Sequence, residues 1–176
     1  MRFSKGTRGF SLPELGVVLM LAGLLLGLAL PTWRHFLEQS CSQNLLEQLS
    51  SALRFTRQQA LLRHQRLSLC PSWDGRICRG NWQQGFLVFK EAERIGEERQ
   101  IIRYFQPSQT QGILHWRAFP YHHPDCHFLP SGMTAYENGT FWYCSAGKAT
   151  PDWALTLSQS GRIREGGVED LNCRSS

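Results

Sequence analysis

The chain has 176 residues, enough for one domain with a sizeable core, and its 41% hydrophobic and 19% charged residues exclude wholesale disorder. Its mean hydropathy of −0.32 excludes a multi-span membrane protein. The formal net charge is +5, and 16 of the 19 basic residues are arginine, the side chain best suited to bidentate phosphate contacts.

The N-terminus combines a short basic segment with an apolar run. Residues 1–9 hold three basic side chains and no acid, and residues 15–30 are apolar. Counted from Phe10, the run is long enough for a membrane span. Residues 27–29 (Gly-Leu-Ala) resemble the cleavage site of an ordinary signal peptide. Glu14 argues against that interpretation, because an ionised carboxylate next to such a run is costly and is kept only for a function.

Residues 9–14 (Gly-Phe-Ser-Leu-Pro-Glu) carry a family resemblance. A glycine, then a phenylalanine, then a glutamate four residues later resembles the motif of type IV prepilins. The resemblance implies that a prepilin peptidase cuts between Gly9 and Phe10 and methylates the new amine. It also implies that Glu14 pairs with the N-terminal amine of a neighbouring subunit in the filament core. Pro31 falls where pilins often carry a proline that loosens the helix.

Apolar residues recur at three- and four-residue spacing through residues 45–61, which predicts an amphipathic helix. We expect one long helix over 10–63, with its outer half packed on a head. The opposite side carries charged residues, and we favour a solvated face over one that binds an anionic partner. These residues are Glu38, Glu47, Arg54, Arg57 and Arg63.

From residue 66 onward, short apolar runs alternate with Gly, Pro, Asn and Asp, which predicts strands and turns. Residues 71–80 and 120–132 are expected to be loops, and Asn138-Gly139 and Ser160-Gly161 tight turns. The fold class is therefore α+β, a long helix packed on an antiparallel sheet. The expected strands are 67–70, 85–90, 101–105, 113–119, 140–145, 153–158 and 162–165. The expected parts are a leader (1–9), a membrane or filament-core segment (10–31), the outer half of the helix (32–65) and the head (66–176).

The head contains motifs that sharpen the resemblance. They are Cys-Pro-Ser at 70–72, Gly-Phe-Leu-Val-Phe at 85–89, Pro-Ser-Gly at 130–132 and Asn-Gly-Thr-Phe at 138–141. Together they resemble the GspH/FimT/FimU group of minor pilins, and the C-terminal end resembles FimT most. The resemblance implies other major and minor pilins as partners. The positive-inside rule places the leader in the cytoplasm and the head on the opposite, oxidising side of the membrane. The resemblance implies a bacterial inner-membrane protein whose head lies in the periplasm and which contacts lipid before assembly.

Residues 161–164 (Gly-Arg-Ile-Arg) match the GRxR motif of FimT-type pilins, which are associated with DNA binding in natural transformation. In a strand, Arg162 and Arg164 share one face while Ile163 points to the core. Gly161 permits the preceding turn. Two adjacent guanidinium groups suit neighbouring phosphates and carry no base information.

Two further basic residues, Lys148 and Arg174, are possible helpers at this site. The alternative is a solvated arginine pair that protects an edge strand from unwanted pairing. Glu165, Glu169 and Asp170 follow closely and partly cancel the local potential. The sequence therefore leaves two functions open: a DNA-binding minor pilin for DNA uptake, and a purely structural minor pilin or pseudopilin.

Six cysteines in a chain of this size predict an oxidising compartment. Cys70 and Cys78 flank one short loop and are the preferred pair. Cys144 has two open partners: Cys173, which would tie the C-terminal tail to the sheet, and Cys126 across a hairpin.

One cluster holds residue types that bind metals: His122, His123, Asp125, Cys126 and His127. Zinc sites usually separate two ligand pairs by a longer loop, and no second pair is obvious, so we favour a polar loop. We expect no metal, no cofactor and no catalysis, because no convincing nucleophile–base set or phosphate-binding glycine loop is present.

Overall fold

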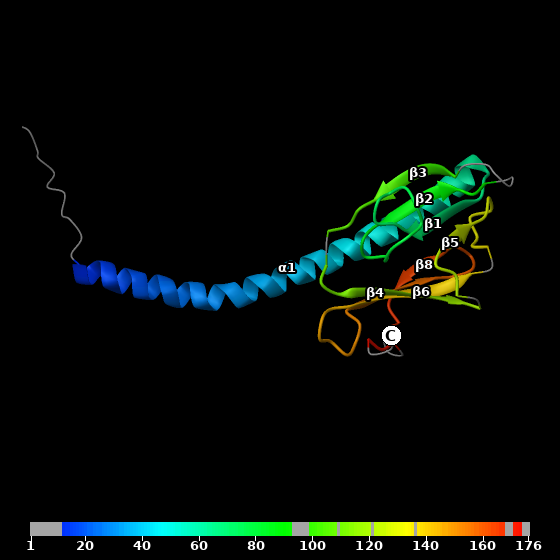
Figure 1. Cartoon of the computed structure of the whole chain (residues 1–176). Helices are drawn as coiled ribbons and strands as arrows, with labels where there is room; N and C mark the ends of the chain where they lie inside the picture. Colours follow the sequence, from blue (N-terminus) through cyan, green and yellow to red (C-terminus); the bar gives the residue numbers. More distant parts are fainter. Residues whose placement is uncertain are drawn as a thin grey trace, which may run out of the picture. The chain divides into compact units, whose positions relative to one another are not determined.

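The computed structural model describes residues 12–92, 99–108, 110–120, 122–135, 137–167 and 171–173 (Figure 1). Their one helix, α1, spans Leu12–Arg63. The chain divides into two compact units, Met1–Leu37 and Glu38–Ser176. The strands are β1 (Leu67–Pro71), β2 (Phe86–Lys90), β3 (Gln100–Phe105), β4 (Ile113–Phe119), β5 (Cys126–Phe128), β6 (Asn138–Cys144), β7 (Trp153–Leu157) and β8 (Ile163–Glu165).

The first unit contains the beginning of α1. Its large apolar side chains are exposed over residues 12–25, and Glu14 is exposed among them. Within the described part of the chain, no helix has the length and apolar character needed to cross a membrane. Residues 1–9 and Phe10, with the expected cleavage site, lie outside the described residues.

The outer part of α1 belongs to the second unit and carries the expected apolar stripe. Thr56 is a polar residue on this buried stripe. Its hydroxyl is satisfied, because Oγ1 donates a hydrogen bond to Ala52 O at 2.7 Å. The helix ends at Arg63, and His64 follows with a φ of 52°, the left-handed conformation common after a helix C-terminus. The buried residues of the stripe are Leu45, Leu46, Leu49, Ala52, Leu53, Thr56 and Ala60.

The strands form two antiparallel four-stranded sheets. The first has the order β3-β2-β1-β5 and the second the order β4-β6-β7-β8. One core joins both sheets to the helix; it includes Leu49 of α1, Phe86 of the first sheet and Leu155 of the second. A buried hydrogen bond of 2.9 Å from Trp153 Nε1 to Ser42 Oγ also fixes the second sheet to α1. The α+β prediction is confirmed, with two sheets in the head.

Two expectations about the head are wrong. The loop expected at 120–132 contains β5, a three-residue strand that pairs with β1; its apolar pattern is too short to detect in the sequence. Asn138-Gly139 is not a turn but the start of β6. A Cβ on Gly139 would lie 2.3 Å from the Trp116 ring, so this glycine makes room for an indole.

Candidate nucleic-acid interface

The GRIR segment lies at an edge of the second sheet. Ile163 and Arg164 open β8, which pairs only with β7, and Arg162 precedes the strand. Ile163 is partly buried and packs against the core, whereas Arg162 and Arg164 are both exposed. Alternation along the strand gives Arg164 the outer face of the sheet, opposite Thr156 of β7. The two guanidinium groups are therefore open to solvent beside a fixed backbone.

The turn before β8 needs a glycine at position 161. Gly161 has a φ of 72°, and its amide donates to Ser158 O at 2.8 Å, so the expected Ser160-Gly161 turn is confirmed. A Cβ here would lie 2.1 Å from Gly132 O. Any larger residue would face both an unfavourable φ and a backbone collision.

Arg57 of α1 holds this turn in place from the helix side. Its Nε donates to Gly132 O at 3.0 Å and its Nη2 donates to Ser160 O at 3.4 Å. The guanidinium group thus joins three segments that are distant in sequence. Because these bonds use one edge of the group, its other donors stay available beside the turn.

A pocket of about 370 Å³ lies between α1 and the turn. It brings three guanidinium groups to one hollow, from Arg54, Arg57 and Arg162, and none of the described residues that line it is acidic. Like charges gathered without an acid raise the local potential and attract anions. The complete lining is Arg54, Arg57, Gln58, Gly161, Arg162 and Ile163.

This pocket adds a neighbouring turn to the arginine face of α1. Arg54 is exposed, as a solvated face predicts, and both Arg54 and Arg57 line the same pocket as Arg162. The spacing of the arginines along the helix was the only feature of the sequence that indicated a shared basic face. It did not reveal the pocket, because nothing local indicates that a turn more than 100 residues later folds back onto the helix.

Of the other basic candidate residues, Lys148 does not line the pocket. Lys148 lies in the connection after β6 and forms an ion pair with Asp152. That connection is at the opposite end of β6 from the turn, roughly 20 Å away at the usual rise of a strand. Burial acts to raise the pKa of Asp152, but hydrogen bonds from Lys148 and Ser145 outweigh it, and the pKa is lowered. Arg174 lies outside the described residues.

The acids close to the GRIR segment are separated from Arg164 where the structure describes them. Glu165 is exposed and, as the next residue along β8, points to the other face of the strand. Glu169 and Asp170 lie outside the described residues.

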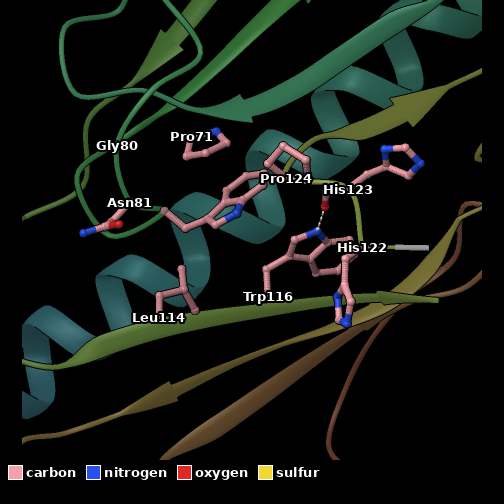
Figure 2. Close-up of a pocket in the computed structure, with 9 residues that line it drawn as sticks. Pro71, Gly80, Asn81, Leu114, Trp116, His122, His123 and Pro124 are labelled. Carbon is pink, nitrogen blue, oxygen red and sulfur yellow. Dashed lines mark hydrogen bonds between the residues drawn. The ribbon is translucent and has the colours of Figure 1, made fainter. Parts of the chain in front are cut away.

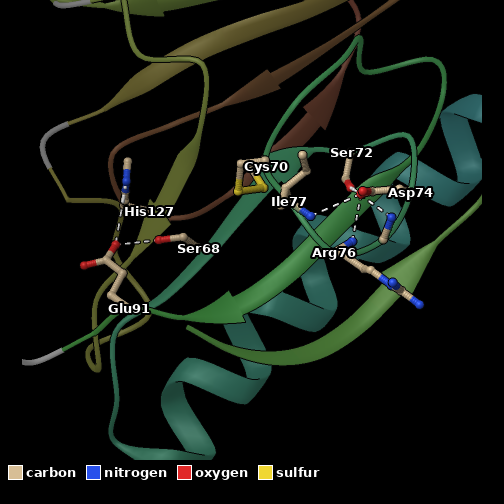
Figure 3. Close-up of a disulfide and its surroundings, with 10 residues drawn as sticks. Ser68, Cys70, Ser72, Asp74, Arg76, Ile77, Glu91 and His127 are labelled. Atoms are coloured by element: carbon tan, nitrogen blue, oxygen red, sulfur yellow. Dashed lines mark hydrogen bonds and ion pairs between the residues drawn. A yellow bond between two sulfur atoms is a disulfide. The ribbon is translucent and has the colours of Figure 1, made fainter. Parts of the chain in front are cut away.

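The structure contains two disulfides, Cys70–Cys78 and Cys144–Cys173. The Cys70–Cys78 loop is braced by Asp74, whose carboxylate accepts from two backbone amides, those of Arg76 and Ile77 (Figure 3). Of the two partners open to Cys144, the structure has Cys173. Cys126 is a buried free thiol, and burial raises its pKa well above the ordinary value.

In the cluster of residues 122–127, His127 is the centre of a hydrogen-bonded network with residues from outside the cluster. Its Nδ1 lies 2.9 Å from Glu137 Oε1, and its Nε2 lies 3.6 Å from Glu91, which also accepts from Ser68 (Figure 3). The bond to Glu137 raises the pKa of His127 despite opposition from burial. Burial raises the pKa of Asp125. Among the described residues, no group of three or more His, Cys, Asp and Glu side chains is placed to hold a metal ion.

A second pocket, of about 400 Å³, lies between the disulfide loop and β4 (Figure 2). Trp82 and Trp116 form its wall, and Trp116 Nε1 donates to His123 O at 2.8 Å. None of the described residues that line it is Lys, Arg, Asp or Glu, so an anion has a far better site between α1 and β8. Its lining is Pro71, Gly80, Asn81, Trp82, Leu114, Trp116, His122, His123 and Pro124.

Comparisons with known proteins agree with this architecture. The family model of the type II transport protein GspH matches residues 45–161. Two crystal structures of the type IV minor pilin FimU from Pseudomonas aeruginosa align with TM-scores of 0.53 and 0.55, at 20% and 19% identity. The alignments cover 76% and 81% of this chain and 98% and 96% of the FimU chains. The minor pseudopilin EpsH of the Vibrio cholerae type 2 secretion system aligns with a TM-score of 0.47 at 13% identity, over 72% of this chain and 98% of EpsH.

No curated protein sequence matches the chain. At such identities the FimU structures show the fold, and the finer resemblance to FimT stays a prediction. The family and the fold are those of structural pilins and not of enzymes. Because the family model matches well over half of the sequence, the chain belongs to the GspH family and is a minor pilin or pseudopilin of the type IV pilus or type II secretion class.

Proposed function

We propose that the head of this minor pilin binds DNA without sequence preference through Arg162 and Arg164, and that it supports DNA uptake in natural transformation. The observation that carries the proposal is the convergence of Arg162 with Arg54 and Arg57 on one pocket without an acidic lining. Guanidinium groups contact phosphate oxygens bidentately, and such contacts position a protein on DNA without reading bases.

Rigidity supports the same proposal. Gly161 is buried in a hydrogen-bonded turn, and Arg57 fixes that turn to the helix. Arginines on a preorganised backbone lose less conformational entropy on binding than arginines on a loose tail. Weak binding by a single head is sufficient, because several heads near a filament tip gain avidity on one polyanion.

We further propose that the exposed apolar part of α1 assembles with other pilins after a prepilin peptidase has cut between Gly9 and Phe10. Before assembly, this part would contact inner-membrane lipid, with the head in the periplasm. Mass spectrometry of the protein isolated from membranes should then show a methylated Phe10 at the N-terminus. Glu14→Ala should leave cleavage intact and reduce incorporation into filaments, whereas a mature chain beginning at Leu30 would contradict this route.

DNA binding is tested with the full-length protein in neutral detergent and a short duplex of arbitrary sequence. Fluorescence anisotropy should give a dissociation constant on the order of 10⁻⁴–10⁻⁶ M at physiological salt. The double variant Arg162→Ala/Arg164→Ala should weaken binding to unrelated sequences by one common factor. It should also reduce the log–log salt slope by roughly 0.9 for each phosphate that the variant no longer neutralises.

Two control variants separate geometry from charge. Arg76→Ala removes one charge from the exposed disulfide loop and should leave binding unchanged. The double lysine variant keeps both charges and should retain part of the affinity while losing the bidentate geometry. If the folded double alanine variant binds as tightly as wild type, with the same salt slope, the chain is a structural minor pilin or pseudopilin without DNA binding.

A further inference from the structure

We propose that the DNA path does not end at the GRIR segment but crosses the outer face of the second sheet to Arg117 of β4. This inference rests on the proposed function and extends its site. The path is a row of four side chains, one from each strand: Arg164, Thr156, Thr140 and Arg117. Nothing in the family resemblance or in the sequence pattern singles out Arg117.

Strand register carries the inference. Arg164 of β8 lies opposite Thr156 of β7, Thr156 lies opposite Thr140 of β6, and Thr140 lies opposite Arg117 of β4. Residues directly opposite one another in antiparallel strands share a face of the sheet. The four side chains therefore form one line perpendicular to the strands, from one edge of the sheet to the other.

Burial shows that this face points to solvent. Arg117 and Arg164 are exposed, and Thr140 and Thr156 are partly exposed. The next residue after Thr140, Phe141, is fully buried in the core on the other face. All four side chains of the row are therefore accessible to a ligand that lies on the outer face.

Arg117 makes a cation–π contact with Trp142. Its guanidinium carbon lies 5.6 Å from the centre of the Trp142 ring, and Trp142 is on the outer face of the neighbouring strand. Such a cation–π contact attracts the guanidinium group without using its N–H groups as hydrogen-bond donors, so they stay available for phosphate oxygens. The arginine is thus oriented before DNA arrives.

The dimensions of the row suit a duplex. Neighbouring strands are about 4.8 Å apart, so three steps separate the two arginines by about 14 Å. That is the axial length of roughly four base pairs. The two threonine hydroxyls between the arginines can donate to intermediate phosphates. Within the strands of this sheet, no outward position carries an acidic residue.

The C-terminal tail limits the path to this end of the sheet. Leu171 and Cys173 pack against Trp142, Cys144 and Ala154, and the Cys144–Cys173 disulfide holds them there. The part of the outer face beyond Trp142 is therefore covered. The row from Arg164 to Arg117 lies between that covered area and the turn that carries Arg162.

The test compares five variants of the full-length protein in detergent, with the same duplex and a range of salt concentrations. One of the five is Arg162→Ala/Arg164→Ala. Arg117→Ala should weaken binding and reduce the log–log salt slope by roughly 0.9, because one phosphate fewer is neutralised. Thr140→Val/Thr156→Val should weaken binding by about two- to tenfold with an unchanged slope, because neutral donors release no counterions. Arg117→Lys should keep the slope, and Arg76→Ala is the control for net charge.

The outcomes separate this inference from the proposed function. If Arg162→Ala/Arg164→Ala weakens binding but Arg117→Ala behaves like Arg76→Ala, the row is wrong and the GRIR site stands. If Arg117→Ala weakens binding and the GRIR double variant does not, DNA is held at Arg117 without Arg164, and both the row and the GRIR site are wrong. Near-ultraviolet circular dichroism of each variant shows that the head is folded; should Arg117→Ala not fold, the Arg117→Gln variant replaces it under the same criteria.

Discussion

The two sheets of the head share one core and one helix, but some of their polar side chains have different surroundings in each. In the first sheet, Ser68, Glu91 and His127 pair with one another and with Glu137 at the sheet's border. In the second, Arg117 and Arg164 are exposed on the outer face. Paired polar groups contribute to stability, whereas exposed donors are available to a ligand. The paired network stabilises the first sheet, while the two arginines leave their donors open to solvent on the second. The first sheet also exposes one arginine, Arg103 of β3, which lies over the rings of Phe55 and Phe105.

The largest expected effect concerns the disulfides, because each sheet has one. They close loops with sequence separations of 8 and 29 residues. In the chain-entropy model, this gives about 2.5 kcal/mol for Cys70–Cys78 and about 3.5 kcal/mol for Cys144–Cys173. Urea unfolding of the two double alanine variants should therefore show the larger loss for the second sheet. Equal losses in the free energy of unfolding would show that residual structure in the unfolded chain, and not loop length, determines how much each disulfide stabilises the head.

The second prediction concerns the network of the first sheet. Glu137 is buried and binds His127, so Glu137→Gln should reduce the free energy of unfolding by about 2 kcal/mol near pH 6. The pKa of His127 is raised from 6.5, so the stability from this pair is complete below pH 6.5 and is lost as the pH rises through the folded-state pKa.

Wild-type stability should accordingly decline over that range in urea titrations at successive pH values. In Glu137→Gln, stability should decline less steeply with pH. Part of the decline should remain, because Glu91 still lies near the other ring nitrogen of His127. An equally steep decline in the variant would assign the pH dependence to other groups. The matched substitution in the second sheet, Arg117→Ala, should change the pH dependence very little, because arginine stays charged throughout.

The smallest effect separates two arginines of the same pocket. Arg57 donates to two backbone carbonyls of the head, so Arg57→Ala should reduce the free energy of unfolding by about 1–1.5 kcal/mol. Arg54 has no hydrogen bond or ion pair within the described residues, and Arg54→Ala should stay within about 0.5 kcal/mol of wild type. Thermal unfolding gives both values. If both arginines bind phosphate, the two variants should nevertheless lower DNA affinity to a similar degree.

Sequence patterns predicted the helix and seven of the eight strands, because apolar periodicity is a local property. The register of the second sheet was not predictable. Nothing local pairs Arg117 with Thr140, since that pairing depends on which strands become neighbours in the folded sheet. The same reason explains β5, whose three residues form a strand only because β1 is beside them.

The candidate site also combines features that the local sequence predicts with features that depend on the folded structure. Arg162 and Arg164 were identified from the motif, and Gly161 was identified as the residue that allows the turn. That Arg54 and Arg57 line a pocket with Arg162 could not be predicted, because it depends on the contact between the turn and the helix. In contrast, Asn138-Gly139 has the composition of a turn and is part of a strand, since Gly139 is required by the ring of Trp116 and not by the backbone.

The position of Cys126 has a consequence for redox chemistry. Cys126 pairs with Leu69, next to Cys70, and both Cys126 and Leu69 face the core, while Cys70 packs on the other face of the sheet with Leu87. Thiol–disulfide exchange requires a thiolate to reach a sulfur atom in line, and here the backbone of β1 stands between them. The protonated, enclosed thiol is therefore inert while the sheet is intact. The head can keep an unpaired cysteine beside a disulfide without shuffling its bridges.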